Sequence, residues 1–581
     1  MTNNLVKKAI TKVIKQNNSM MILLFITVCG VVLTSLVPPQ ILRLIIDNNL
    51  VPKNSDKLLT LAIAYLGVLL FIGVFNFMKA ALLTILGQKI TLEIRMEMML
   101  KLENINAQFF TTNESGTIVS RFTNDVEAIN SLFTTGVIGM MIDCLKIIGI
   151  VISIWFFSAA LGMLTLMLLP VIYAITRTFQ KKMLQAQIEN RILVARVNNY
   201  IAESFKNILM IKTYSKERYM EENYTERLRD NYETVEKVNF YDSVFSPIIL
   251  LIRAVIIALI VILSSEQLNY LGISLGMVAA SIGLISNLFT PVENLGMELQ
   301  NIQQAISGVQ RVNDFYNEPE DDGKDNSLYF ADIIPQREEF NLSFNDVTFQ
   351  YEQGQEVIQN INLNLNAQDK VTFIGRTGAG KSTLFKLVMG LLKPTSGTIT
   401  INGIDVYSIP NREKRKIFGY VEQNFHMIPG SIADQISLQD ESITRNQIED
   451  ALDFVGLTDY VETMENGLDT QLTNDTLFSQ GQQQLLAIAR AIVMNPPILL
   501  LDEITANLDS ITEERVVSVL QKASAAHTIF SISHRLSSMI SSDMIVILEN
   551  GRIKNAGTAE MLWQNDDWYR SHISLQRLTW N

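Results

Sequence analysis

The sequence predicts two parts of different kinds, a helical membrane domain of six spans followed by a soluble α/β domain. Long apolar runs fill residues 20–300. After about residue 325, short apolar strands alternate with helical segments, as they do in soluble α/β proteins. The composition has 48% hydrophobic and 18% charged residues, which is too apolar for an ordinary soluble enzyme and too charged for a membrane bundle alone.

Six segments are apolar over enough residues to cross a bilayer, which takes about 20. They are Met20–Ile45, Leu58–Leu86, Ser131–Ser158, Ala159–Thr176, Ser243–Leu263 and Leu271–Thr290. The N-terminus and the segments between spans 2 and 3 and between spans 4 and 5 are rich in basic residues, which places all three in the cytoplasm. We expect the long segments to extend the spans as helices, closed by short cross-helices near Thr111–Ile118 and Glu203–Lys212. Ordinary cytosolic loops are the alternative.

Seven ionisable residues lie within or near the expected spans, where a charge in hydrocarbon is costly. They are Arg43, Lys79, Asp143, Lys146, Arg177, Arg253 and Glu293. Such residues either line a polar pathway, or snorkel to the interface, or lie on a helix already outside the membrane. For any one of them we favour the latter two. Asp143 and Lys146 are three residues apart, so a pair on one helix face is expected.

The remaining composition excludes several classes of function. The net charge of −12 argues against nucleic acid as a partner, because phosphate binding needs a basic surface. Cys29 and Cys144 are the two cysteines and both lie in apolar runs, so neither a disulfide framework nor a thiolate metal site is expected. A signal peptide is the competing interpretation of the N-terminus, but the apolar run is too long and further spans follow it.

A glycine-rich loop stands between a short apolar strand, Val371–Ile374, and a helix, Leu384–Leu391. Its residues are Gly375, Arg376, Thr377, Gly378, Ala379, Gly380, Lys381, Ser382 and Thr383. Glycines let the backbone N–H groups curl around phosphates, and the helix N-terminus adds partial positive charge. We expect Lys381 to reach the β- and γ-phosphates of ATP and Ser382 to bind Mg²⁺. The loop in this context predicts a nucleotide site.

Two carboxylates follow a second buried strand, Ile498–Leu501. Side chains at the C-terminal end of such a strand lie near the phosphate loop. Asp502 suits Mg²⁺, and Glu503 suits a base that orients or polarises the attacking water. A further strand, Thr528–Ile532, leads to His534, for which we expect a contact with the γ-phosphate. Taken alone, His534 has an ordinary surface position as its alternative.

Residues 478–482, Phe-Ser-Gln-Gly-Gln, resemble the signature of the ATP-binding cassette (ABC) family, normally Leu-Ser-Gly-Gly-Gln. The resemblance extends over essentially the whole chain. It implies a transmembrane domain at 1–320, a linker at 321–339 and an α/β P-loop NTPase domain of the ABC type at 340–581. It further implies adenine stacking for Tyr351, a Mg²⁺-contacting and catalytic loop position for Gln423, and contacts to the partner subunit's ATP for Ser479, Gln480, Gly481, Gln482 and Asp509.

One position departs from the family pattern. Gln480 stands where the family has a glycine that lets the backbone approach the opposing γ-phosphate, so the site to which this chain lends its signature should be weakened. The chain's own Lys381, Asp502, Glu503 and His534 are intact. We therefore expect a heterodimer with a different, related half-transporter. A homodimer that tolerates Gln480 is the alternative.

The resemblance implies a half-transporter in a lipid bilayer that uses ATP hydrolysis to export a lipophilic, drug-like, lipid or peptide substrate by alternating access. An importer on the exporter fold, as in siderophore uptake, is one alternative. An ATP-gated channel or regulatory sensor is another, which the presence of Glu503 and His534 disfavours. We expect a bacterial cytoplasmic membrane, with both termini and the ATPase domain in the cytoplasm.

Overall fold

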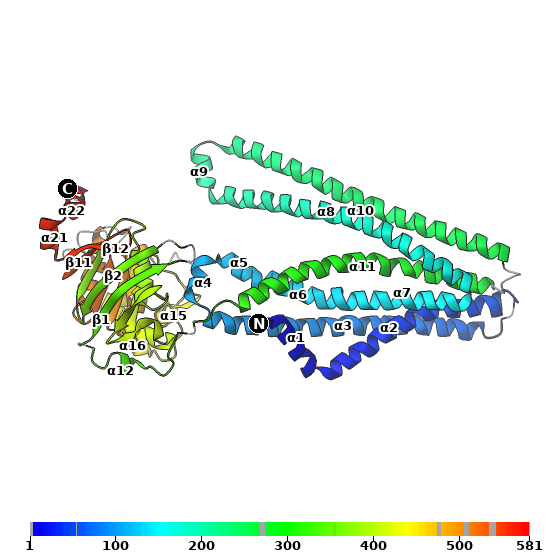
Figure 1. Cartoon of the computed structure of the whole chain (residues 1–581), viewed down its shortest axis with the longest axis horizontal. Coiled ribbons are helices and arrows are strands. Elements are labelled where there is room, and N and C mark those ends of the chain that lie inside the picture. Colours follow the sequence, from blue (N-terminus) through cyan, green and yellow to red (C-terminus); the bar gives the residue numbers. More distant parts are fainter. Residues whose placement is uncertain are drawn as a thin grey trace. The chain divides into compact units, whose positions relative to one another are not determined.

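The chain divides into two compact units, which are described separately below (Figure 1). The first comprises Met1–Glu103 and Asn113–Glu318, and the second Asn104–Thr112 and Pro319–Asn581. The computed structural model describes residues 4–53, 55–267, 274–321, 323–337, 339–351, 354, 356–472, 478–504, 508, 510–533 and 542–579.

The first unit is all helical, and six of its helical segments are long and apolar enough to cross a membrane. This confirms the predicted number of spans. Most of the helices are longer than the apolar runs because they continue as polar or amphipathic helix. The elements are α1 (Leu5–Gln16), α2 (Asn18–Ile45), η1 (Ile46–Leu50), α3 (Leu58–Asn104), α5 (Ser115–Ser120), η2 (Arg121–Asp125), α6 (Val126–Ser131), η3 (Leu132–Val137), α7 (Ile138–Phe157), α8 (Ala159–Lys206), α9 (Ile208–Thr213), α10 (Glu217–Gln267) and α11 (Leu275–Tyr316).

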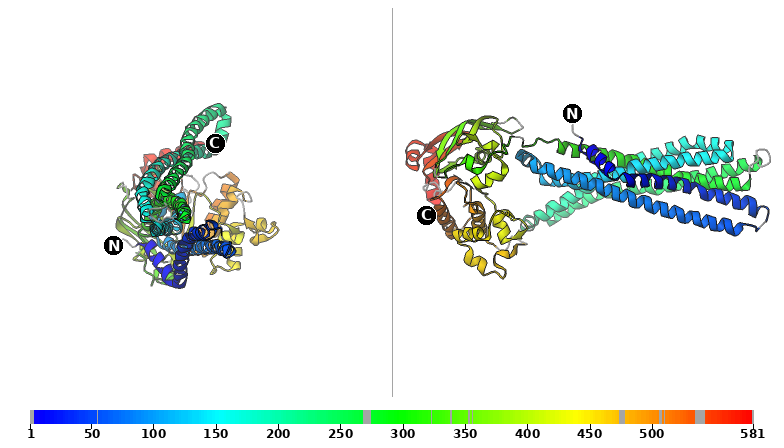
Figure 2. Two further views of the ribbon diagram at one scale, coloured as in Figure 1. Left: turned by 90° about the vertical axis from the view of Figure 1, so that its right-hand side faces the viewer. Right: turned by 90° about the horizontal axis from the view of Figure 1, so that it is seen from below.

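Helices α8 and α10 pack side by side as an antiparallel pair, joined by α9 (Figures 1 and 2). Towards α9 this pair diverges from α6 and α11. The second expected cross-helix is therefore present, but it begins at Ile208 because the preceding residues complete α8. The first expected cross-helix region holds two short helices, α4 (Ala107–Thr112) and α5, with a break at Asn113 and Glu114.

Apolar side chains on the outside of the helical unit are strongly exposed. Phe156 is 84% exposed, Leu59 74% and Phe77 73%. A protein surrounded by water rarely presents so much apolar surface, whereas lipid tails cover it without cost. The inside of the bundle is packed with branched aliphatic side chains such as Ile154 and Ile260, both fully buried.

The second unit contains two larger sheets. An antiparallel sheet has the order β2-β1-β4-β5, and a six-stranded sheet has the order β12-β11-β3-β10-β9-β6. In the six-stranded sheet every neighbouring pair is parallel except β11 and β12. The strands are β1 (Asn341–Gln350), β2 (Glu356–Asn366), β3 (Lys370–Ile374), β4 (Ser396–Ile401), β5 (Ile404–Asp405), β6 (Phe418–Val421), β9 (Ile498–Asp502), β10 (Thr528–Ile532), β11 (Met544–Glu549) and β12 (Arg552–Gly557).

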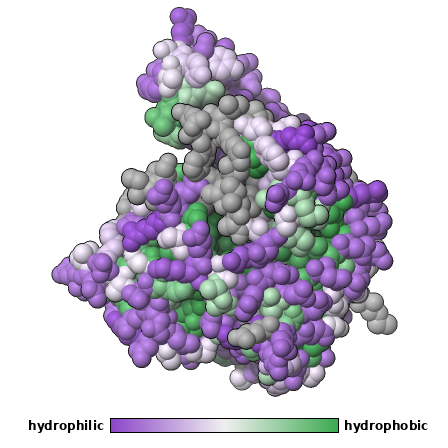
Figure 3. Space-filling model, turned by 90° about the vertical axis from the view of Figure 1, so that its left-hand side faces the viewer, coloured by the Kyte–Doolittle hydropathy of each residue, from purple (hydrophilic) through white to green (hydrophobic). Residues whose placement is uncertain are grey.

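Strand order explains how distant segments form one site. Parallel neighbours β3, β10, β9 and β6 present their C-terminal ends at the same edge of the sheet. The loops that leave this edge lead to helix α13 (Lys381–Val388) and to Gln423, Glu503 and Ser533. The face of this unit drawn in Figure 3 is largely hydrophilic, with apolar side chains in scattered patches, as expected of a domain in water.

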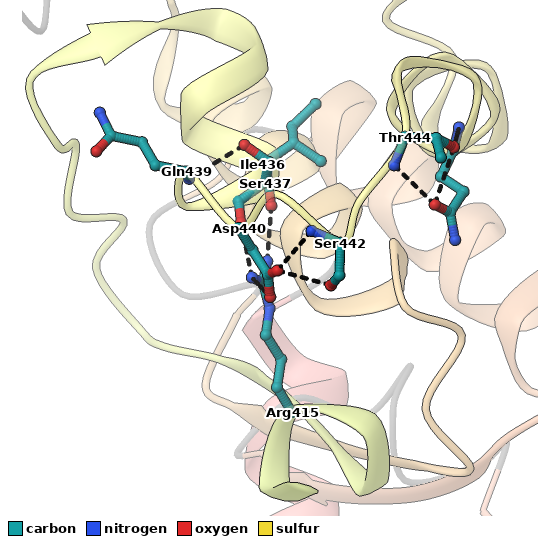
Figure 4. Close-up of polar contacts among 8 residues, drawn as sticks. Arg415, Ile436, Ser437, Gln439, Asp440, Ser442 and Thr444 are labelled. Carbon is teal, nitrogen blue, oxygen red and sulfur yellow. Dashed lines mark hydrogen bonds and ion pairs between the residues drawn. The ribbon is translucent and has the colours of Figure 1, made fainter. Parts of the chain in front are cut away.

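Helices that flank the six-stranded sheet form a hydrophobic cluster in this unit. They are α15 (Ile432–Ser437), α16 (Arg445–Val455), α17 (Thr458–Glu462), α18 (Gln480–Ile492) and α19 (Ser510–Ala523). Arg415 of α14 (Asn411–Ile417) ties the sheet to this cluster, since its guanidinium donates to the carbonyl oxygens of Ile436 at 3.0 Å and Ser437 at 2.6 Å (Figure 4). Arg415 also pairs with Asp440 at 3.4 Å. These contacts hold the strained turn after α15, where Leu438 has a φ of 55°.

Candidate nucleotide site

A cavity of about 430 Å³ lies at the edge of the sheet where β3 and β9 end. Three chain segments far apart in sequence meet there: the glycine-rich loop, the turn after β6 and the end of β9. The lining residues are Val357, Thr377, Gly378, Gly380, Lys381, Ser382, Thr383, Gln423, Asp502 and Glu503.

Two glycines of the loop hold positions that no other residue can occupy without strain. Gly375 has a φ of 155°, and a Cβ there would overlap the carbonyl oxygen of Leu548. Gly380 has a φ of 99°, and its Cβ would lie 2.9 Å from the carbonyl oxygen of Val357. Both positive φ angles bend the backbone into the tight curve that turns amide groups towards a phosphate. Ala379, between Gly378 and Gly380, packs into the core beneath the loop, and Arg376 is exposed and does not line the cavity.

Lys381 begins helix α13 and turns its side chain back into the loop. Its Nζ donates to the carbonyl oxygens of Gly375 at 2.7 Å and Arg376 at 3.2 Å. Burial lowers the pKa of Lys381, while the carboxylates of Glu503 and Asp502 oppose that shift. The ammonium of Lys381 is thus held within the loop, close to the N-terminus of α13. A bound polyphosphate would be stabilised by the lysine charge and by the partial positive charge of the helix end.

The two carboxylates after β9 have different environments. Asp502 accepts hydrogen bonds from the hydroxyls of Ser382 and Tyr420, which lower its pKa, but burial and the nearby charge of Glu503 raise it more. Glu503 has a left-handed φ of 48°, which is uncommon for a glutamate and is typical of strained functional positions. Its carboxylate accepts a hydrogen bond of 3.1 Å from Gln423 Nε2. Asp502 is therefore positioned to bind a cation and Glu503 faces the open cavity.

Two residues that support this arrangement have no motif in the sequence. Gln484 of α18 is buried and donates from Nε2 to the Gln423 carbonyl oxygen at 2.8 Å. Tyr420 lies on β6 opposite Leu500 of β9, and this pairing brings its hydroxyl to Asp502. Burial raises the pKa of the Tyr420 hydroxyl, so it stays protonated and donates. The strand order reveals the contact of Tyr420 and the packing of α18 reveals that of Gln484, and the sequence states neither.

The donor set fits a magnesium ion. Ser382, Gln423 and Asp502 bring a hydroxyl, an amide and a carboxylate to the same cavity. Mg²⁺ prefers oxygen ligands of this kind and usually takes one or two carboxylates together with substrate phosphates. The side chains of Ser382 and Asp502 are hydrogen-bonded to each other, so the hydroxyl and the carboxylate lie together.

Tyr351 is the predicted adenine contact that the described residues include. It does not line the cavity, but its hydroxyl lies 3.3 Å from the hydroxyl of Thr383, which does. The Tyr351 ring packs edge-on against Phe349, with centroids 4.9 Å apart. Asp509 and His534 lie outside the described residues.

The signature residues form the start of α18, away from the lining of the cavity. Ser479 caps the helix, and its backbone N–H donates to Gln482 Oε1 at 2.9 Å. Gln480 is exposed as the first helical residue. Gly481 is buried, and a Cβ there would overlap Cγ2 of Thr512 on α19. The chain thus needs glycine at 481 for its own packing but tolerates a long side chain at 480.

Comparison with known families matches both units. The model described as ABC transporter transmembrane region matches residues 20–292, and the model described as ABC transporter matches residues 358–506. The chain belongs to the ABC transporter family. This ABC transporter has the order of a half-transporter, with one membrane region fused to one ATP-binding domain, and it is an ATPase coupled to transport.

Relatives and solved structures agree with that assignment. An uncharacterized ABC transporter ATP-binding protein of Bacillus subtilis, YfiC, is 25% identical, with 95% of this chain and 91% of that protein aligned. The lactococcin-A transport/processing ATP-binding protein LcnC of Lactococcus lactis is 29% identical, over 87% of this chain and 70% of that protein. The structure of a bacterial Atm1-family ABC exporter with ATP bound shares the fold, with a TM-score of 0.77 at 21% identity, over 96% of this chain and 98% of that one.

Proposed function

We propose that this chain is the catalytically intact half of a heterodimeric ABC exporter that moves its substrate out of the cytoplasm by alternating access. One observation carries the proposal. Lys381, Asp502 and Glu503 meet in a single cavity, whereas Gln480 projects from the start of α18. A chain with intact hydrolytic residues and an altered signature is suited to a partner half whose signature is intact and whose hydrolytic residues are altered.

The cavity supports hydrolysis of ATP by this chain's own groups. Lys381 neutralises charge on the β- and γ-phosphates. Glu503 polarises a water molecule, whose oxygen forms a bond to the γ-phosphorus while the bond from that phosphorus to the ADP oxygen breaks. Glu503 accepts the proton that the water loses. Mg²⁺, held by Ser382, Gln423 and Asp502, would offset negative charge on the phosphate oxygens.

Gln423 links this chemistry to the rest of the domain. Its amide contacts Glu503, and its backbone carbonyl is fixed by Gln484 of α18, the helix that begins at the signature. A displacement of α18 therefore reaches Glu503 through two hydrogen bonds. We propose that α9, where Leu209 is 81% exposed, and the region of α4 and α5 are the coupling elements of the transporter.

The membrane and substrate assignments rest on the sequence and on the relatives. The basic residues of the long inter-span segments support a cytoplasmic location for both termini and the ATPase domain, and we propose a bacterial cytoplasmic membrane. We propose that the substrate belongs to the lipophilic, drug-like, lipid or peptide classes, and the relative named for lactococcin-A transport is consistent with this range.

The test is Glu503→Gln in the transporter purified from its native membrane with any partner half. Loss of the base should lower ATP hydrolysis by about 10²–10⁴-fold while ATP still binds. Glu549→Gln is the matched control, because Glu549 ends β11 in the same sheet, does not line the cavity and is 44% exposed. Undiminished hydrolysis in the Glu503 variant would show that the reaction occurs at another site.

A further inference from the structure

A cavity of about 660 Å³ lies within the membrane unit, between α3, the α6–α7 segment and α11. Its volume is in the range of small-ligand sites, about 300–1,000 Å³. Its lining is polar for a membrane protein. The lining includes Lys79, Gly139, Asp143, Lys146, Asn294 and Glu298.

Four of these residues carry opposite charges in equal number: Lys79 and Lys146, Asp143 and Glu298. The expected pair between Asp143 and Lys146 is not formed. Asp143 instead accepts a hydrogen bond of 2.9 Å from Asn294 Nδ2. Within the described part of the chain, none of the four side chains forms an ion pair with another residue. The four groups compensate one another's charge only at a distance, without a close ion pair, so charged groups of a ligand can enter between them.

Glu298 shows most clearly that the cavity is built for a polar ligand. Its side chain lines the cavity, the residue is only 8% exposed, and Oε2 has no hydrogen-bond partner among the described residues. Gly139 on α7 makes room for it, because a Cβ at 139 would overlap Glu298 Oε1. A buried acceptor without a partner is unfavourable, and a donor on a ligand would remove that cost.

The depth of the charges places them on a membrane-crossing path. At about 1.5 Å per residue, Lys146 lies about 17 Å and Glu298 about 35 Å from the ends of α7 and α11 that adjoin the short turns. The hydrocarbon core is about 30 Å thick. With the orientation proposed above, about 35 Å carries Glu298 past the hydrocarbon core, so the cavity extends from the cytoplasmic half of the core to the cytoplasmic interface, from which an exporter takes its substrate.

We propose that this cavity is a binding site for a zwitterionic, peptide-like substrate, with Glu298 and Asp143 receiving its ammonium group and Lys146 and Lys79 its carboxylate. The assignment rests on the proposed export function and narrows its substrate class. A purely lipophilic molecule would supply no charge to either pair, and a simple cation or anion would supply a charge to only one pair. A zwitterion, with one charge of each sign, supplies an ammonium to the two carboxylates and a carboxylate to the two lysines.

The test uses trileucine with free ends, its N-acetyl form, its C-terminal amide and the doubly blocked form. Binding of each is measured by titration calorimetry to the transporter purified from its native membrane, in lipid nanodiscs without nucleotide. Free trileucine should bind, and blocking either end should weaken binding by about tenfold or more. If the unmodified protein binds the doubly blocked form as tightly as free trileucine, or binds the lipophilic cation tetraphenylphosphonium more tightly, the proposal is wrong.

Two variants then test which cavity residue binds each end of the peptide. Glu298→Gln should abolish the preference for a free ammonium, and Lys146→Met the preference for a free carboxylate. Glu293→Gln is the matched control, because Glu293 lies on the same helix but does not line the cavity, and it should retain both preferences. Unchanged preferences in both cavity variants would mean that the charges serve only to shape the protein.

The same preparations separate this inference from the proposed function. ATP hydrolysis that depends on Glu503 and drives export, without any preference among the four peptides, would refute the zwitterion site alone. A clear preference for free trileucine without ATP-driven export would refute the export function alone.

Discussion

Alanine at position 481 should destabilise the ATP-binding domain, although the substitution adds one methyl group. The new Cβ would overlap Cγ2 of Thr512 and lie 3.2 Å from its Cβ. Both positions are on helices, α18 and α19, so neither backbone can move without disturbing the packing behind it. Overpacking of this kind costs about 1–3 kcal/mol, and we expect about 3 because the contact is between two packed helices. For a domain of this size that corresponds to a melting temperature lower by about 6–12 °C.

The assay is thermal unfolding of the purified transporter, with hydrogen exchange to locate the change in α18 and α19. Gln480→Ala is the matched control, because its side chain is exposed and its loss should change stability by less than about 0.5 kcal/mol. Thr512→Ser removes Cγ2, so the double variant Gly481→Ala/Thr512→Ser should recover most of the loss. If the Gly481→Ala and Gln480→Ala proteins have the same melting temperature, the packing argument is refuted.

Three further outcomes follow from the structure of this domain. Lys381→Met should abolish the rise in melting temperature that ATP produces, whereas Lys386→Met, on the same helix but outside the cavity, should retain it. Burial and the neighbouring Lys324 lower the pKa of Lys414 from 10.5 to about 7. At a pH between these two values, Lys414 is protonated in the unfolded chain and neutral in the folded chain. Stability should therefore rise from pH 7 to pH 10, and Lys414→Met should flatten that rise in thermal unfolding. Arg415→Met should destabilise the domain by about 2–3 kcal/mol in denaturant unfolding, because two carbonyl oxygens at the end of α15 lose their donor; an unaltered midpoint would contradict this.

The strand–loop–helix segment around Lys381 could be predicted because the signal is local. A buried strand, closely spaced glycines and a helix start occur within about 20 consecutive residues. The same holds for Asp502 and Glu503, which directly follow a run of four aliphatic residues. Tyr420 and Gln484 could not be predicted, because their contacts depend on which strand lies beside β9 and on how α18 packs.

The membrane unit shows the limit of hydropathy. The sixth span was expected to end at Thr290, but α11 continues to Tyr316 because its later residues are amphipathic, with Ala305, Val312 and Phe315 buried at helical spacing. Glu298 lies in that continuation and was not among the candidate charges. Its importance appears only when α7 and α11 are packed together, since Gly139 and Asn294 have no recognisable pattern of their own.

The most direct test of the central claim is to tag this chain at its chromosomal locus, purify it from its native membrane and identify the proteins that come with it. We predict a second, related half-transporter in equal amount, whose own signature retains the glycine that Gln480 replaces, with hydrolysis abolished by Glu503→Gln. A complex that contains only this chain and hydrolyses ATP at full rate would contradict the account, because Gln480 would then serve both nucleotide sites.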